Sequence, residues 1–167
     1  MPTFFIPGDN GWLDCADADE AYGFWTQHLF PFNDIHWETS DLKTVAGPGA
    51  EGTSNYIVER SSITRNEGQK RTELFSIYIK DREILFIGLS LPGSGKGNGY
   101  EDKLAGRSQL QQDNIDWVES QLFNYSTAPD YGVSGVVIVG HAISSTNLGV
   151  RDRLRGIIPM SIRTSRS

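Results

Sequence analysis

Cysteine is almost absent from this 167-residue sequence: Cys15 is the only one, so no disulfide can form within the chain. The sequence also lacks an apolar run of the roughly 20 residues that a membrane-spanning helix needs. Its first residues, Met1-Pro2-Thr3, have neither the basic start nor the long apolar stretch of a secretory signal. We therefore expect a soluble chain without a signal peptide or transmembrane segment, stabilised by one hydrophobic core.

Positive charge is also in short supply. The sequence has 15 Lys and Arg residues against 21 Asp and Glu, which gives a net charge of -6 and a pI near 5.0. Binding to nucleic acid requires a basic surface that releases counterions from phosphates, so nucleic acid is not an expected partner. The end of the chain is a local exception, because residues 151–167 contain five arginines and only one acidic residue, Asp152. Such a charged run is typical of a solvated end.

Hydrophobic patterning predicts an α/β chain of alternating strands and helices. The predicted elements are a strand over residues 3–7, a helix over 17–29, a strand over 55–59, a hairpin of strands 74–79 and 84–91, a helix over 108–125 and a strand over 133–140. The polar stretch from 31 to 72, apart from its one strand, is predicted to run over the surface. Because a helix separates the last two strands, we expect them to pair in parallel through a right-handed crossover.

Two of the predicted strands end in polar side chains that could bind a metal. The strand over 3–7 leads into Asp9 and Asn10, and the apolar run Val136–Val139 ends two residues before His141. Oxygen and imidazole donors at strand ends are those that a divalent metal centre uses in phosphate ester hydrolysis. Two simpler interpretations stay open at this point: Asp9 and Asn10 cap a turn, and His141 bonds to the backbone.

Two other motifs do not match the sites they resemble superficially. The glycine-rich loop around Lys96 lacks the spacing of a phosphate-binding loop, because Ser90 and Gly97 stand where a glycine and a hydroxyl residue are required. A serine hydrolase is not indicated, since His141 stands where a nucleophile elbow would carry serine. Nucleotide binding and serine hydrolysis are therefore disfavoured.

The turn that contains Asp9 and Asn10 resembles a family signature. Residues Pro7–Cys15 are similar to the Gly-Asp-Asn-Glu-Trp-x-Asp-Cys signature of a branch of the calcineurin-like metallophosphoesterases. The signature is fairly specific, and the likeness covers most of residues 3–142. It continues through Glu59–Ser61, Arg65–Glu67, Gly88–Ser94, Gln112–Phe123 and Val136–Ala142.

This resemblance implies a partial calcineurin-like domain over residues 1–142, a β-sandwich of two sheets flanked by helices, followed by a divergent basic segment over 143–167. It also implies a two-metal site at strand ends, where activated water attacks a phosphate ester substrate. Asn10 matches the family's asparagine ligand, His141 matches the first of its late histidine ligands, and Asp9 lies in the same turn as Asn10. The implied cofactors are divalent ions: Mn, Fe, Zn or Mg.

The sequence departs from the family pattern around these ligands. Gly11 stands where the family has a Glu or His, and glycine can neither protonate a leaving group nor stabilise a transition state. The family's opening Asp-x-His strand has no counterpart in the six residues before Pro7, and no histidine follows His141. The sequence therefore predicts a metallophosphoesterase-like protein that is inactive as an isolated chain and binds metal weakly or not at all. The alternative is a noncatalytic structural or interaction subunit with a protein partner at an exposed sheet edge.

Overall fold

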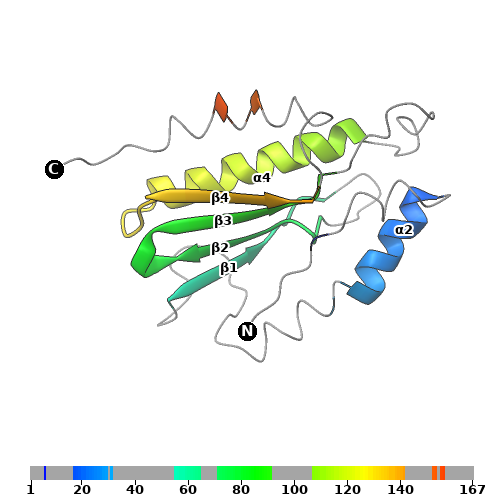
Figure 1. Ribbon diagram of the computed structural model, residues 1–167, viewed down its shortest axis with the longest axis horizontal. Helices are drawn as coiled ribbons and strands as arrows, with labels where there is room; N and C mark the ends of the chain where they lie inside the picture. The colour runs from blue at the N-terminus through cyan, green and yellow to red at the C-terminus, as the bar shows by residue number, and fades with distance from the viewer. Residues whose placement is uncertain are drawn as a thin grey trace.

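The described part of the chain forms one mixed β-sheet with a long helix against it (Figure 1). The computed structural model describes residues 6, 17–29, 31, 55–64, 71–91, 107–141, 152–153 and 155–156. In chain order the elements are α2 (Ala18–Phe24), the π-helix η1 (Trp25–Leu29), β1 (Tyr56–Arg60), β2 (Phe75–Ile79), the 3-10 helix η3 (Lys80–Arg82), β3 (Ile84–Leu89), α4 (Arg107–Thr127) and β4 (Gly135–Gly140). Helices and a mixed sheet confirm the general α/β class.

The sheet has the strand order β1-β2-β3-β4. Strands β1, β2 and β3 pair antiparallel, and β3 pairs in parallel with β4. The turn between β2 and β3 closes through Glu83, which adopts a left-handed backbone with φ 52°. The backbone amide of Ser134 donates to the Glu83 carbonyl at 2.8 Å, which fixes the start of β4 beside this turn. The predicted hairpin and the predicted parallel pair are both confirmed.

Helix α4 connects β3 to β4 and covers one face of the sheet. Its buried apolar side chains recur at the spacing of an α-helix and therefore lie on one side of the helix, which faces the strands. The core between them consists of Ile57, Leu74, Tyr78, Leu85, Ile87 and Leu89 from the sheet side with Trp117, Val118, Leu122 and Tyr125 from α4. The indole Nε1 of Trp117 donates to the carbonyl of Phe75 at 3.3 Å, which satisfies the one polar atom of this buried ring.

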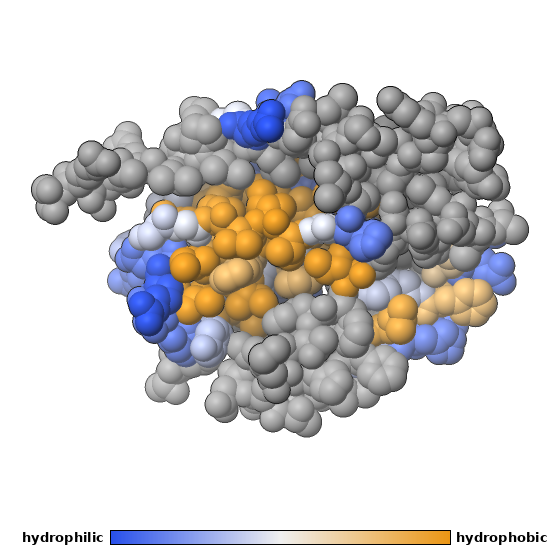
Figure 2. All heavy atoms as spheres, viewed as in Figure 1, coloured by the Kyte–Doolittle hydropathy of each residue, from blue (hydrophilic) through white to orange (hydrophobic). Residues whose placement is uncertain are grey.

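The opposite face of the sheet is also apolar, and part of it is exposed. At one end Val58 and Phe75 are buried, with Ile6, Ile77 and Val139 packed against them. Further along the strands, Tyr56 is 40% exposed and Val137 is 39% exposed. Figure 2 shows apolar atoms gathered over the strands in this view of the molecule. The continuous apolar run of β4 follows from this arrangement, because both of its faces meet apolar neighbours.

The structure describes part of the first two predicted elements. The helix predicted over 17–29 is confirmed as α2 followed by η1, in which Trp25 is buried, whereas Phe24 and Leu29 are 55% and 47% exposed. In the π-helix η1 each hydrogen bond joins residues i and i+5. The 3.6-residue spacing of an α-helix therefore does not predict which side chains of η1 share a face. Of the predicted strand over 3–7 only Ile6 is described, and it is not part of a strand.

The predicted surface course of residues 31–72 is wrong at Ser61 and Arg71, whereas Ser62 and Thr64 are exposed as predicted. Ser61 is buried, and Arg71 has no exposed surface at all. The amide of Arg71 donates to the carbonyl of Ile63 at 2.8 Å, which joins the segment after β1 to the segment before β2. At Arg71 the polar side chain therefore belongs to a buried hydrogen-bonded network, described below.

Candidate functional site

The carboxyl ends of three strands meet at one edge of the sheet, which we call the carboxyl edge. The register pairs Arg60 with Phe75 and Phe75 with Gly88, so β1 and β3 end where β2 begins. In the parallel pair Leu89 lies opposite Gly140, so β4 ends at the same edge. His141 follows β4 directly and is exposed. This edge is the part of an α/β sheet where binding sites commonly form.

The exit from β3 lies directly against the end of β4. A Cβ atom placed on Gly140 would lie 2.8 Å from Cδ1 and 3.3 Å from Cγ of Leu91. Real Cβ contacts are longer than this, so the Leu91 side chain occupies the space that a larger residue at position 140 would need. Leu91 and the backbone just before His141 are therefore packed together.

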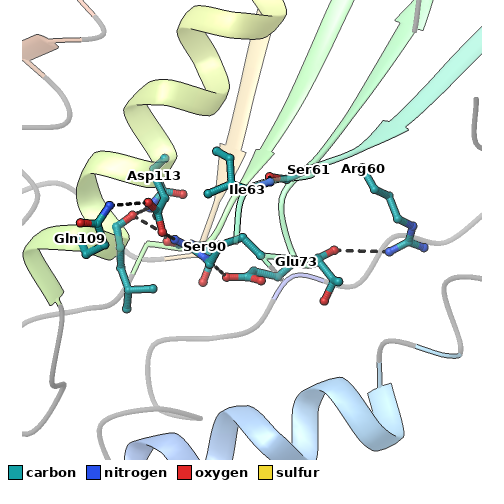
Figure 3. A network of polar contacts seen from close by, with 11 residues as sticks. Arg60, Ser61, Ile63, Glu73, Ser90, Gln109 and Asp113 are labelled. Atoms are coloured by element: carbon teal, nitrogen blue, oxygen red, sulfur yellow. Dashed lines mark hydrogen bonds and ion pairs between the residues drawn. The ribbon is translucent and has the colours of Figure 1, made fainter. Parts of the chain in front are cut away.

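A buried ion network supports the carboxyl edge from the side of α4. Arg71 donates through Nε to the Glu73 carboxylate and through Nη1 to Oδ2 of Asp113 at 2.7 Å, and all three side chains are buried. Gln109 Nε2 donates to the other Asp113 oxygen at 2.8 Å. Figure 3 shows Gln109 and Asp113 on α4 next to Ser90 and Glu73 from the sheet side. The network connects the entry to β2 with the first turns of α4.

The charge state of Arg71 is fixed by this network. Burial acts to lower the pKa of Arg71, but the charge of Glu73 and the hydrogen bonds to Glu73 and Asp113 outweigh burial and hold this pKa above its usual range. The guanidinium therefore remains a buried cation between two carboxylates. Removing it would leave both carboxylates buried without their cation.

Asn114 connects α4 to the end of β3. Its Nδ2 donates to the carbonyl of Ser90 at 2.7 Å and to the carbonyl of Leu110 at 2.9 Å. Arg71 Nη1 also reaches the Leu110 carbonyl, at 3.3 Å. Asn114 is fully buried and Ser90 is 2% exposed. The side chain of Asn114 therefore holds the residue at which the chain leaves β3.

Three atoms of this region are buried without a hydrogen-bond partner among the described residues: Arg71 Nη2, Thr72 Oγ1 and Asn114 Oδ1. An unsatisfied buried polar group costs about 1–3 kcal/mol. Arg71 Nη2 is a donor, Asn114 Oδ1 is an acceptor and the Thr72 hydroxyl can be either. Ordered water commonly forms hydrogen bonds to such groups in protein interiors.

The structure places one of the three predicted metal ligands. His141 lies at the carboxyl edge, whereas Asp9 and Asn10 lie outside the described residues. Within the described part of the chain, no group of three His, Cys, Asp or Glu side chains could hold a metal ion. Of the predicted ligands, the described residues thus supply only the imidazole of His141.

Sequence reasoning missed the buried network. Arg71 stands in a polar stretch, which suggested a surface segment. A signal did exist on α4, where Asp113 and Asn114 fall at helical spacing between Leu110 and Trp117, all four of them buried. Polar residues on the apolar face of a helix are expected to have buried partners, and this pattern could have identified Asp113 and Asn114.

A second buried polar cluster lies near the opposite edge of the sheet. The rings of Tyr78, Tyr125 and Tyr131 pack with centroids 4.5–5.8 Å apart. Tyr78 donates its hydroxyl to the Gly132 carbonyl at 2.6 Å, and Tyr125 donates to Glu59 at 2.5 Å. Burial chiefly raises the pKa of Tyr78, the amide of Gly132 lowers it, and the charge of Glu83 raises it, with a net increase. These contacts join α4, β2 and the approach to β4.

Comparison with known proteins gives no relative: no protein-family model, no curated protein and no solved structure matches this chain. A separate examination of the described helices finds none that is both long and apolar enough to cross a membrane.

Proposed function

We propose that the carboxyl edge is the ligand-bearing edge of a metallophosphoesterase-like domain, and that the chain by itself does not hydrolyse phosphate esters. The position of Ile6 carries the proposal. Ile6 packs against Val58 and Phe75 at the end of the sheet where Val139 also packs. His141 is two residues beyond Val139, and Asn10 is four residues beyond Ile6.

Chain geometry then limits how far Asn10 can lie from this edge. An extended chain spans at most about 3.6 Å per residue, so Asn10 lies within about 14 Å of Ile6 along the chain. Asp9 is one residue nearer. The length of the chain after Ile6 therefore permits the approach of Asp9 and Asn10 to the edge at which His141 is exposed, which the resemblance to the family implies.

A divalent ion, Mn, Fe, Zn or Mg, would polarise the phosphate ester and lower the pKa of bound water. In this chain His141 would supply an imidazole donor, and Asn10 with Asp9 would supply oxygen donors. Gly11 offers no acid to protonate the leaving group, which supports inactivity of the isolated chain. The exposed apolar face opposite α4 is where a second sheet of the proposed sandwich would pack.

Metal binding and turnover test this proposal separately. We expect Mn²⁺ to bind weakly and to bind more weakly to a His141→Ala variant. The matched control is His28→Ala, because His28 is an exposed histidine on η1. With Mn²⁺ and an aryl phosphate, we expect no turnover above the protein-free rate. Binding that is unchanged by His141→Ala would remove the metal-ligand role, and robust turnover by the chain alone would refute the inactivity.

A second candidate function is a noncatalytic subunit that pairs with another copy of this chain. It is favoured by the apolar sheet face, where Tyr56 and Val137 are both about 40% exposed on the outer strands of the described sheet. Because Tyr56 and Val137 are uncharged, two copies of this face could pack against each other without burying a charge at these two residues. Light scattering should then give a dimer, and Val137→Asp should give a monomer. A stable monomer of the unmodified chain would contradict this second function.

A further inference from the structure

We infer that Asn114 is a positioning residue for His141, acting through the end of β3. The inference rests on the proposed function for its importance, since His141 is the described ligand of the proposed site. Asn114 is a buried amide on α4, whereas His141 follows β4.

The path from Asn114 to His141 consists of two contacts and two covalent neighbours. Asn114 Nδ2 donates to the Ser90 carbonyl at 2.7 Å. Ser90 is followed by Leu91, whose Cδ1 fills the space 2.8 Å from where a Cβ of Gly140 would lie. Gly140 is followed by His141. A shift of the Ser90 carbonyl therefore moves Leu91 against the backbone that carries the imidazole.

Asn114 shares a hydrogen-bond acceptor with Arg71. Its Nδ2 also donates to the Leu110 carbonyl at 2.9 Å, and Arg71 Nη1 donates to the same carbonyl at 3.3 Å. Arg71 is fixed in turn by Asp113, the neighbour of Asn114 on α4. The amide is thus preorganised by a buried network before it reaches Ser90, as outer residues of ligand sites commonly are.

The chain offers a matched control for this role. Gln121 lies seven residues after Asn114, two turns along α4, and is 1% exposed. It accepts a hydrogen bond from Ser76 Oγ at 2.6 Å, so it contacts β2 and not the end of β3. Asn114→Leu and Gln121→Met each replace one buried amide by an apolar side chain of similar length. A purely structural role predicts similar effects from both changes.

The experiment records the histidine ring signals of the full chain by ¹H–¹³C NMR at one pH, with His141 assigned through a His141→Gln variant. We expect Asn114→Leu to displace the His141 signal and Gln121→Met to leave it in place. In a Mn²⁺ titration, we expect Asn114→Leu to require roughly 10-fold more metal for equal broadening of His141. Leu91→Ala removes the contact between Leu91 and the backbone at Gly140. This variant should displace the His141 signal even if Asn114→Leu does not fold.

The outcomes separate this inference from the proposed function. The positioning role is overturned if a folded Asn114→Leu variant leaves the His141 signal unmoved, if Leu91→Ala leaves it unmoved, or if Gln121→Met moves it equally. If Mn²⁺ fails to broaden His141 in the unmodified chain, the proposed metal function fails. The metal-free comparison of the three variants still decides whether Asn114 positions His141.

Discussion

The ring of Phe75 lies directly over Gly88 in the antiparallel pair of β2 and β3. The two residues are register partners, and a Cβ placed on Gly88 would lie 2.3 Å from Cε1 and 2.5 Å from Cζ of Phe75. Phe75 is 3% exposed and forms the buried part of the apolar face opposite α4. The Phe75 ring thus occupies the space in which any side chain at position 88 would begin, so glycine is the residue that fits opposite Phe75.

Gly88→Ala should lower the free energy of unfolding by about 1–3 kcal/mol, because the added methyl forces the Phe75 ring out of its position. Denaturant unfolding measures the change. Gly23→Ala is the control, since nothing lies within 4 Å of a Cβ at that helical position. The double variant Gly88→Ala/Phe75→Leu should recover part of the loss. Equal stability of Gly88→Ala and the unmodified chain would contradict the observed contact.

Arg71→Met should destabilise the fold by about 3–5 kcal/mol, because it leaves Glu73 and Asp113 buried without their cation. Thermal unfolding followed by circular dichroism is a sufficient measurement. Arg82→Met is the matched control, because Arg82 and Asp81 form a 3.8 Å pair at the surface with side chains 73% and 55% exposed. Such exposed pairs contribute little, so the control should unfold like the parent. Similar losses from both variants would show that burial of the network is not what matters.

Stability should decrease in alkaline solution because of Tyr78. The folded-state pKa of Tyr78 is raised above the unfolded value of about 10. The stability from this group is therefore fully present below pH about 10 and is lost as the pH rises through the folded pKa. Tyr78→Phe should flatten this alkaline decrease, while costing about 1 kcal/mol at neutral pH for the lost hydrogen bond to Gly132. An unchanged pH slope in Tyr78→Phe would refute the assignment.

The two glycines that bound β4 should respond in opposite directions to alanine. At Gly135 the nearest atom to an added Cβ is Ile84 Cγ1 at 3.8 Å, an ordinary contact. Gly135→Ala should therefore stabilise the chain by about 0.5–1 kcal/mol through the lower entropy of the unfolded state. Gly140→Ala should destabilise it, because the methyl displaces Leu91. Chemical denaturation of both variants gives the comparison, and two changes of the same sign would contradict it.

Local patterning predicted most of the described fold. Strand β1, the hairpin of β2 and β3, and helix α4 each follow from the spacing of apolar residues within one short segment. The parallel pairing of β3 and β4 follows from a connection long enough for a helix. These features depend on near neighbours in the chain, so periodicity is sufficient to predict them.

The candidate site could be predicted only in part. His141 was singled out because it follows an apolar strand, and the structure places it at the carboxyl edge. Asp9 and Asn10, predicted with it, lie outside the described residues. The position of Asn114 on the apolar face of α4 indicates a buried partner, but no local pattern identifies that partner as the Ser90 carbonyl, 24 residues away.

The sequence by itself determined which segments form strands and helices, since backbone hydrogen bonding and the alternation of apolar side chains act locally. Only the tertiary structure decided that Arg71 is a core residue, because its partner Asp113 lies 42 residues away on α4. Likewise, the need for glycine at positions 88 and 140 comes from Phe75 and Leu91 on neighbouring strand ends. The burial of a side chain and its close contacts depend on which distant segments of the chain pack together. These contacts form only when α4 packs against the sheet.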